Sequence, residues 1–138
     1  MAARDKYHSA VRIALEKEQW NITDDPLRLE VAGTKFELDL GAEQLLAAER
    51  GEEKIAVEIK TFLSDSPLTD YHAALGQFLN YQLALEINDP TRRLYLAIPT
   101  RTYKGFFQRE FTQISLERYQ IKQIIYDPEK EVIVRWIS

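Results

Sequence analysis

The chain has 138 residues, of which 45% are hydrophobic and 29% charged, and these values fit one compact domain spanning residues 1–138. It contains no cysteine and only two histidines, so disulfides, thiolate zinc sites and a cysteine nucleophile are excluded, and a histidine-based metal site is not expected. No apolar run approaches the roughly 20 residues of a membrane span or resembles a secretion signal, so we expect a cytoplasmic protein without a membrane partner.

The predicted elements begin with an amphipathic helix over Arg4–Gln19, in which apolar residues recur at helical spacing. The segment NITDDP, which follows, ends this helix. Two strands, Leu27–Ala32 and Thr34–Leu40, are joined around Gly33, and the second alternates apolar and polar residues, so the pattern predicts a β-hairpin. We assign no element to the next stretch, EQLLAAERGEE.

A third strand is predicted over Lys54–Phe62. Successive side chains of a strand point to opposite sides of a sheet, so one side of this strand is apolar and the other carries an acid and a base. Such a pair on an exposed strand also has an ordinary explanation in cross-strand charge pairing. The two sets are Ile55, Val57 and Ile59 on one side and Lys54, Ala56, Glu58 and Lys60 on the other.

The second half of the chain begins with a long predicted helix over Leu68–Ile87, which Asp89-Pro90 closes. A short buried strand, Arg93–Pro99, and a helical segment, Tyr103–Arg118, follow. Two strands, IKQIIYD and EVIVRWI, flank a turn at the end of the chain. The order α, β, β, β, α, β, α, β, β predicts an α/β fold in which helices flank both faces of a mixed β-sheet.

The net charge of −4 conceals an uneven distribution. Between Thr91 and Gln123 seven basic residues accompany two acidic ones, a local balance of +5 that leaves −9 for the remainder. Lysine and arginine supply most of the affinity for duplex DNA by neutralising phosphates. We expect Arg101, Lys104 and Arg109, in the helical segment, to contact DNA. The seven basic residues are Arg92, Arg93, Arg101, Lys104, Arg109, Arg118 and Lys122.

The acid and base of the third strand suggest phosphodiester chemistry. If the hairpin brings Asp39 onto a neighbouring strand, its carboxylate converges with Glu58 and Lys60, and two close carboxylates require a cation between them. Mg²⁺ is held at about 2.1 Å by such carboxylates and by water. We predict that Asp39, Glu58 and the carbonyl of Ile59 bind Mg²⁺ or Mn²⁺. Lys60 would orient or deprotonate the attacking water and stabilise charge on the phosphorus.

The spacing of Asp39 and Glu58-Ile59-Lys60 resembles the metal-binding signature of restriction-endonuclease-like nucleases, whose core order is αβββαβ. In GQFLNYQ, Gln77 and Tyr81 are similar to a glutamine and tyrosine motif that follows this strand in recombination-type members. The resemblance implies catalytic roles for both, and their i, i+4 spacing places them on one side of a helix. Those nucleases often carry a further acid on the first helix, and either Asp5 or Glu16 fits that place.

The whole chain resembles the XisH family, the fdxN-element excision controlling factors of cyanobacteria. The resemblance rests on RDKYHSAVRIALEKEQWNIT, LDLGAE, AVEIKTF and YDPEKEVIVRWI. It implies a role in DNA recombination, the excision of a DNA element during heterocyst differentiation. It also implies two partners, a site-specific recombinase and the small XisI companion factor.

Three functions therefore stay open. The first is a Mg²⁺-dependent endonuclease acting on DNA or a branched recombination intermediate. The second is a non-cleaving DNA-binding or recombination-accessory protein, and the third is a protein-interaction module that binds the XisI-type factor. The apolar content and the C-terminal strand VIVRWI are expected to leave apolar surface or a strand edge uncovered, so we also predict a homodimer or a complex with the companion.

Overall fold

The structure is a computed structural model, and it describes residues 3–36 and 44–138, with the side chains of residues 3–5 and 44 outside the described part. A six-stranded mixed sheet forms its centre, in the spatial order β1-β4-β5-β6-β7-β8. The pairs β5/β6 and β6/β7 are parallel, and the other pairs are antiparallel. The strands are β1 (Asn21–Asp24), β4 (Gln44–Arg50), β5 (Glu53–Ile59), β6 (Arg93–Pro99), β7 (Gln123–Asp127) and β8 (Val132–Ile137).

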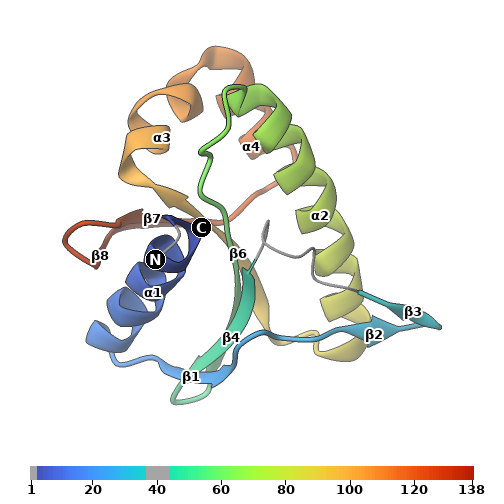
Figure 1. Cartoon of the computed structure of the whole chain (residues 1–138). Coiled ribbons are helices and arrows are strands. Elements are labelled where there is room, and N and C mark those ends of the chain that lie inside the picture. Colours follow the sequence, from blue (N-terminus) through green and yellow to red (C-terminus); the bar gives the residue numbers. More distant parts are fainter. Residues whose placement is uncertain (1–2, 37–43) are drawn as a thin grey trace.

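Helices cover both faces of this sheet (Figure 1). The long helix α2 packs on one face, and α1 packs on the other, against β7 and β8. A second sheet of two short strands, β2 and β3, lies beside α2. None of the described helices is long and apolar enough to cross a membrane. The remaining elements are α1 (Ala3–Lys17), β2 (Glu30–Val31), β3 (Thr34–Lys35), α2 (Pro67–Asn88), α3 (Thr100–Lys104), the 3₁₀ helix η1 (Phe106–Gln108) and α4 (Glu110–Arg118).

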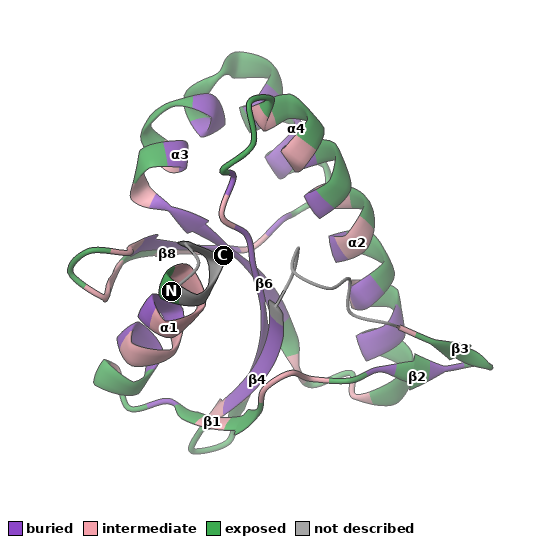
Figure 2. Cartoon of the chain, viewed as in Figure 1, coloured by how far each residue is buried: buried purple, intermediate pink, exposed green. Residues whose placement is uncertain are grey.

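The core consists of two layers separated by the sheet, and the inner strands are buried along most of their length (Figure 2). In β5, Ile55, Val57 and Ile59 join the cluster on the α1 side. Ala56 joins the cluster on the α2 side. The predicted alternation of this strand is therefore confirmed, and its polar residues point to the α2 side.

Local signals fix the boundaries of α2. Pro67 occupies the first turn, where its missing N–H costs nothing, and the Ser66 side chain accepts a hydrogen bond from the Thr69 amide. The helix ends at Asn88, directly before Asp89-Pro90. The prediction of a helix over Leu68–Ile87 is confirmed, as is the strand Arg93–Pro99.

The N-terminal half differs from the prediction. Only Glu30–Val31 and Thr34–Lys35 pair in the expected hairpin, and they belong to the small sheet rather than to the central one. The first strands of the central sheet are β1, within the segment assigned as a helix stop, and β4, within the stretch left without an element. Strand β4 is an inner strand buried on both sides, so it lacks the period-two pattern of a half-exposed strand.

Two further boundaries are corrected. The helical segment Tyr103–Arg118 is divided into α3, η1 and α4, with Gly105 at the first break and Arg109 at the second. Strand β5 ends at Ile59, although the Lys60 amide still donates to the Ala97 carbonyl of β6 at 3.2 Å. The elements around the central sheet nevertheless begin α1, β1, β4, β5, α2, β6, so the predicted αβββαβ order in a mixed sheet is confirmed.

Both outer strands of the central sheet are irregular. The pairing of β1 with β4 shifts register between Ile22 and Asp24. The pairing of β7 with β8 shifts between Ile125 and Tyr126. Such bulges twist a strand and interrupt its row of backbone hydrogen-bonding groups.

Candidate active site

The acid and base of β5 are both buried, at the end of the strand that lies under α2. Glu58 is fully buried between Leu45 of β4 and Leu96 of β6, its neighbours in the sheet register. Lys60, two residues on, is 9% exposed. An ordinary solvated strand face would leave both side chains in water, and burying a charge is costly unless it is compensated. The exposed charge-pair explanation of Glu-x-Lys is therefore wrong for this strand.

Helix α2 brings a polar side chain to this end of β5. The Lys60 Nζ donates a 2.6 Å hydrogen bond to Oε1 of Gln77. Tyr81 lies one turn further along the same side of the helix and is buried, with its ring 5.8 Å from that of Phe36. The structure thus brings Lys60 and Gln77 together and places Tyr81 on the sheet-facing side of α2, as the i, i+4 spacing predicts.

The backbone of Lys60 is fixed from the other side of the sheet. The Tyr126 hydroxyl of β7 donates to the Lys60 carbonyl at 3.2 Å. Burial raises the pKa of Tyr126 above its ordinary value, so the hydroxyl keeps its proton and remains a donor. The sequence carries no motif that identifies Tyr126, because it lies on a different strand and on the opposite side of the sheet.

A basic side chain from α3 reaches the segment that follows Lys60. The Arg101 guanidinium donates to the Thr61 carbonyl at 3.0 Å and to the Phe62 carbonyl at 3.4 Å. Arg101 therefore holds the loop after β5, a contact that the charge count does not predict.

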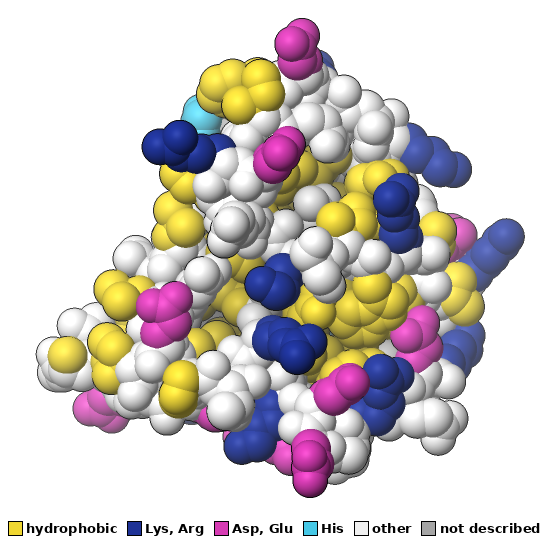
Figure 3. Space-filling view, turned by 180° about the vertical axis from the view of Figure 1, so that it is seen from behind, with side chains coloured by type: hydrophobic (Ala, Val, Ile, Leu, Met, Phe, Trp, Pro, Cys, Tyr) yellow, Lys and Arg dark blue, Asp and Glu magenta, His cyan; other side chains and the backbone are white. Residues whose placement is uncertain are grey.

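The other two basic residues predicted to contact DNA have different surroundings. Lys104, at the end of α3, is exposed. The Arg109 guanidinium lies 5.1 Å from the centre of the Phe106 ring, in a cation–π arrangement. Over the back of the molecule, Lys and Arg side chains are interspersed with Asp and Glu side chains (Figure 3). On that surface the charges are mixed rather than separated into one basic and one acidic face.

The oxygen donors for a cation are only partly within the described residues. Glu58 and the backbone of Ile59 lie at the end of β5, and carboxylate and carbonyl oxygens are the ligands that Mg²⁺ prefers. Asp39 lies outside the described residues, so its predicted convergence with Glu58 is untested. Across residues 3–36 and 44–138 no group of three His, Cys, Asp or Glu side chains could hold a metal. A complete site requires a further ligand, and Asp39 is the predicted one.

The structure does not choose between the two candidate N-terminal acids, Asp5 and Glu16. The Asp5 side chain lies outside the described part of α1. Glu16 is exposed in the last turn of α1, the helix that covers the sheet face opposite Glu58.

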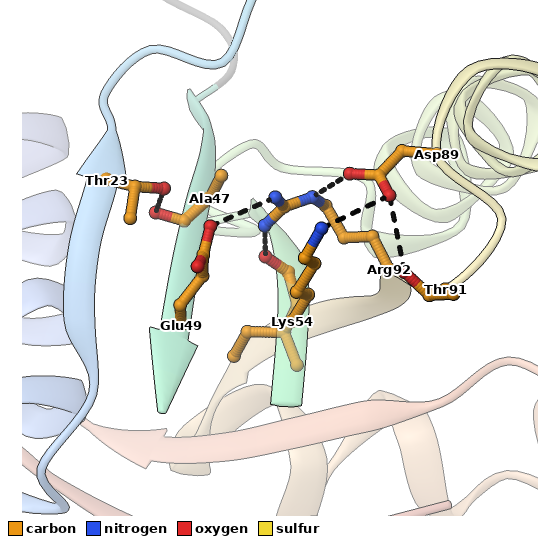
Figure 4. Close-up of polar contacts among 8 residues, drawn as sticks. Thr23, Ala47, Glu49, Lys54, Asp89, Thr91 and Arg92 are labelled. Atoms are coloured by element: carbon orange, nitrogen blue, oxygen red, sulfur yellow. Dashed lines mark hydrogen bonds and ion pairs between the residues drawn. The ribbon is translucent and has the colours of Figure 1, made fainter. Parts of the chain in front are cut away.

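A second polar cluster lies at the opposite end of β5 and centres on Arg92 (Figure 4). Its side chain is 9% exposed and donates to Asp89 at 2.9 Å, to the Ile55 carbonyl at 3.0 Å and to Glu49 at 3.5 Å. Lys54 adds a 3.9 Å ion pair with Asp89. Although Arg92 belongs to the basic segment of the sequence, its side chain joins β4, β5 and the end of α2.

Comparison with known proteins supplies the family. The model of the XisH protein family matches residues 1–134. An XisH family protein from Nostoc punctiforme is 49% identical, with a TM-score of 0.90 over 97% of this chain and 100% of that one. An fdxN element excision controlling factor protein from Anabaena variabilis is 47% identical, with a TM-score of 0.90 over 97% of this chain and 99% of that one. A comparison with curated proteins gives no match. The chain therefore belongs to the XisH family.

Proposed function

We propose that this protein is a controlling factor for excision of a DNA element and that it acts as a Mg²⁺-dependent endonuclease. The observation that carries the proposal is the burial of Glu58 and Lys60 on one side of β5, with the Lys60 ammonium held by Gln77. An acid and a base are rarely buried together without a function, because desolvating them is costly. The relative from Anabaena variabilis, an fdxN element excision controlling factor protein, supports the biological role.

In this mechanism each residue of the site has a separate task. The carboxylates of Glu58 and Asp39, with the Ile59 carbonyl, would hold Mg²⁺, which when bound offsets negative charge on the phosphate. Lys60 orients the attacking water and stabilises the charge that develops on the phosphoryl oxygens. Gln77 fixes the direction of the Lys60 ammonium through the 2.6 Å hydrogen bond. Tyr126 fixes the backbone at the same residue.

DNA binding is assigned to the surface near α3. Lys104 and Arg109 are exposed and supply positive charge close to the chain segment that Arg101 fastens beside Lys60. Each neutralised phosphate contact should flatten the slope of log affinity against log salt by about 0.9. Lys104→Gln and Arg109→Gln should each show this change, and Lys17→Gln, on α1, serves as the control that leaves the slope unaltered.

The alternative function is a non-cleaving accessory factor that works with a recombinase and an XisI-type companion. It is favoured by one observation: the relative from Anabaena variabilis is a controlling factor for excision, a role that does not itself require cleavage. In that case Glu58 and Lys60 are retained for folding, and the protein binds DNA or its companion without cutting.

The deciding experiment is incubation of the purified protein with Mg²⁺ or Mn²⁺ and linear, nicked, branched and single-stranded DNA. We expect metal-dependent cleavage of at least one substrate by the wild type and none by Glu58→Gln or Asp39→Asn. Glu52→Gln, which changes an exposed acid in the turn before β5, at the opposite end of that strand from Glu58, should cleave normally. DNA binding without cleavage of any substrate would establish the accessory function instead. Absence of DNA binding at low salt would leave the protein-interaction module.

A further inference from the structure

Helix α2 has an apolar surface on the side that faces away from the sheet. The helix has 22 residues, yet Asp70 and Glu86 are its only carboxylates and it contains no lysine or arginine. Leu79, Leu83 and Ile87 are 39%, 57% and 59% exposed. A helix that covers one face of a sheet normally has a charged outer side, and one that is apolar all round is normally buried on all sides. The outer side of α2 therefore has the composition of a covered surface.

The exposed residues of this side follow the spacing of a helix–helix seam. His72, Gly76, Leu79, Leu83 and Glu86 recur at intervals of four, three, four and three residues. This 3.5-residue period keeps one stripe of a helix facing a neighbouring helix. The stripe lies on the opposite side of α2 from the buried Phe78 and Tyr81. We call it the outer seam of α2.

Gly76 lies in the middle of the outer seam, where the packing of the single chain gives no reason for a glycine. A Cβ added at Gly76 would meet no atom within 4 Å, and the residue is not in the left-handed region of backbone conformation. Glycine destabilises the interior of a helix relative to alanine. A small residue at the centre of a seam allows a second helix to approach closely, so the position is explained by a partner helix rather than by the monomer.

The charges on the outer seam identify the partner as a second copy of this chain. Leu79 is the midpoint between His72 and Glu86, seven residues from each. If two copies of α2 pack antiparallel about a two-fold axis at Leu79, each His72 lies opposite the Glu86 of the second copy. The same axis places Leu75 opposite Leu83. A parallel pairing would instead put Glu86 against Glu86.

We propose that the protein forms a two-fold symmetric homodimer in which the outer seams of two α2 helices pack antiparallel through Leu79, Leu83 and Gly76. Such an interface is isologous, with the same surface used by both copies. Gln77 and Tyr81 point to the sheet from the other side of the helix, so the dimer leaves the candidate active site uncovered. The inference does not depend on cleavage or on DNA binding.

The first test is the molecular mass in solution, measured by sedimentation velocity from micromolar to near-millimolar protein. The wild type should have twice the 16.1 kDa mass of one chain at the higher concentrations. Leu83→Glu should remain monomeric, because each new carboxylate would be buried opposite Leu75 of the second copy without a partner. Ile114→Glu is the matched control, since Ile114 is 56% exposed on α4 and Leu83 is 57% exposed on α2. Both substitutions are at exposed positions, and circular dichroism should confirm that both variants fold.

The orientation is tested by cross-linking, for which the absence of native cysteine is an advantage. Leu79→Cys lies at the proposed axis and should be joined to its copy by a short bis-maleimide. Leu68→Cys is eleven residues from the axis, so its two copies would be about 33 Å apart and should not react. Glu86→Lys should raise the dissociation constant several-fold, and His72→Glu in the same chain should restore it.

Three results would overturn the inference. The wild type could remain monomeric throughout, including the case in which it associates only with a different protein. Leu83→Glu could dimerise as strongly as Ile114→Glu. Leu68→Cys could cross-link as efficiently as Leu79→Cys, which would indicate a parallel pairing.

Discussion

A buried cation lies at each end of β5, and the two cations have different hydrogen-bond acceptors. At the beginning of the strand, Arg92 donates to two carboxylates and a backbone carbonyl. At its end, Lys60 donates to the side-chain amide of Gln77. A carboxylate acceptor adds charge neutralisation to a hydrogen bond, whereas the amide oxygen of Gln77 contributes direction. The comparison sets a cation that joins three structural elements against one that, in the proposed mechanism, is positioned for a phosphate.

The chemistry of arginine and of lysine suits these two sets of contacts. The planar guanidinium of Arg92 binds three acceptors in fixed directions, which suits a junction of β4, β5 and α2. The ammonium of Lys60 is a compact charge on a flexible stem, which needs an orienting contact such as Gln77.

The largest expected effect is a loss of stability when Arg92 is replaced. Arg92→Met should lower the free energy of unfolding by about 2 kcal/mol, because it removes the hydrogen bonds to Asp89, Glu49 and the Ile55 carbonyl. Arg93→Met changes an exposed neighbour and should alter stability by less than about 0.5 kcal/mol. Urea denaturation of both variants provides the measurement. An equal, small effect of the two substitutions would contradict the structural role of Arg92.

A smaller change in stability, of opposite sign, is expected from a substitution at the Lys60 end of β5. Glu58→Gln should raise the free energy of unfolding of the metal-free protein by about 1 kcal/mol, since it keeps the side-chain shape and removes one of the two carboxylates that the proposed site brings together. Asp89→Asn, at the Arg92 end, should instead destabilise the protein. The same urea titrations report both changes. If Glu58→Gln is as destabilising as Asp89→Asn, the two ends are equivalent and the comparison fails.

The smallest effect concerns the hydroxyl that fixes the Lys60 carbonyl. Tyr126→Phe removes this buried donor and should lower stability by about 1 kcal/mol at neutral pH. Because burial raises the pKa of Tyr126, the folded state favours the protonated phenol, and this contribution is present below pH about 10 and is lost as the pH rises further. Tyr126→Phe should therefore lose less stability than the wild type in alkaline solution.

Thermal unfolding between pH 8 and 11 measures this difference. Tyr119→Phe is the control, because Tyr119 is 45% exposed, whereas Tyr126 is fully buried. A steeper alkaline loss for Tyr126→Phe than for the wild type would contradict the proposed linkage.

Much of the site could be predicted because its residues lie on strongly patterned elements. The alternation in β5 assigns Glu58 and Lys60 to one side, and helical spacing places Gln77 and Tyr81 together on α2. Both patterns are local, so a single sequence is enough to find them. The contact between Lys60 and Gln77 is not local, and the resemblance implies only that Gln77 belongs to the same site.

The features that were missed depend on tertiary context. Strand β4 is buried on both sides, so its run of leucines and alanines has no period to detect. The hairpin pattern at Gly33 was correct locally, but nothing in its alternation states which sheet it joins. Arg92 was counted with the basic residues of the segment Thr91–Gln123. Its burial could not be predicted, because Glu49 on β4 is distant in sequence and Asp89 reaches Arg92 only through the way α2 ends.

The irregular outer strands of the sheet have a consequence for aggregation. An exposed, regular strand edge can add strands from other molecules without limit, which is the first step toward fibrils. Here β1 has only four residues and a register shift, and β8 pairs with β7 through another. Arg135 places a charge within the apolar run VIVRWI and donates to the Tyr103 hydroxyl. These features disfavour the addition of further strands at either edge of the sheet, although the terminal strand is apolar.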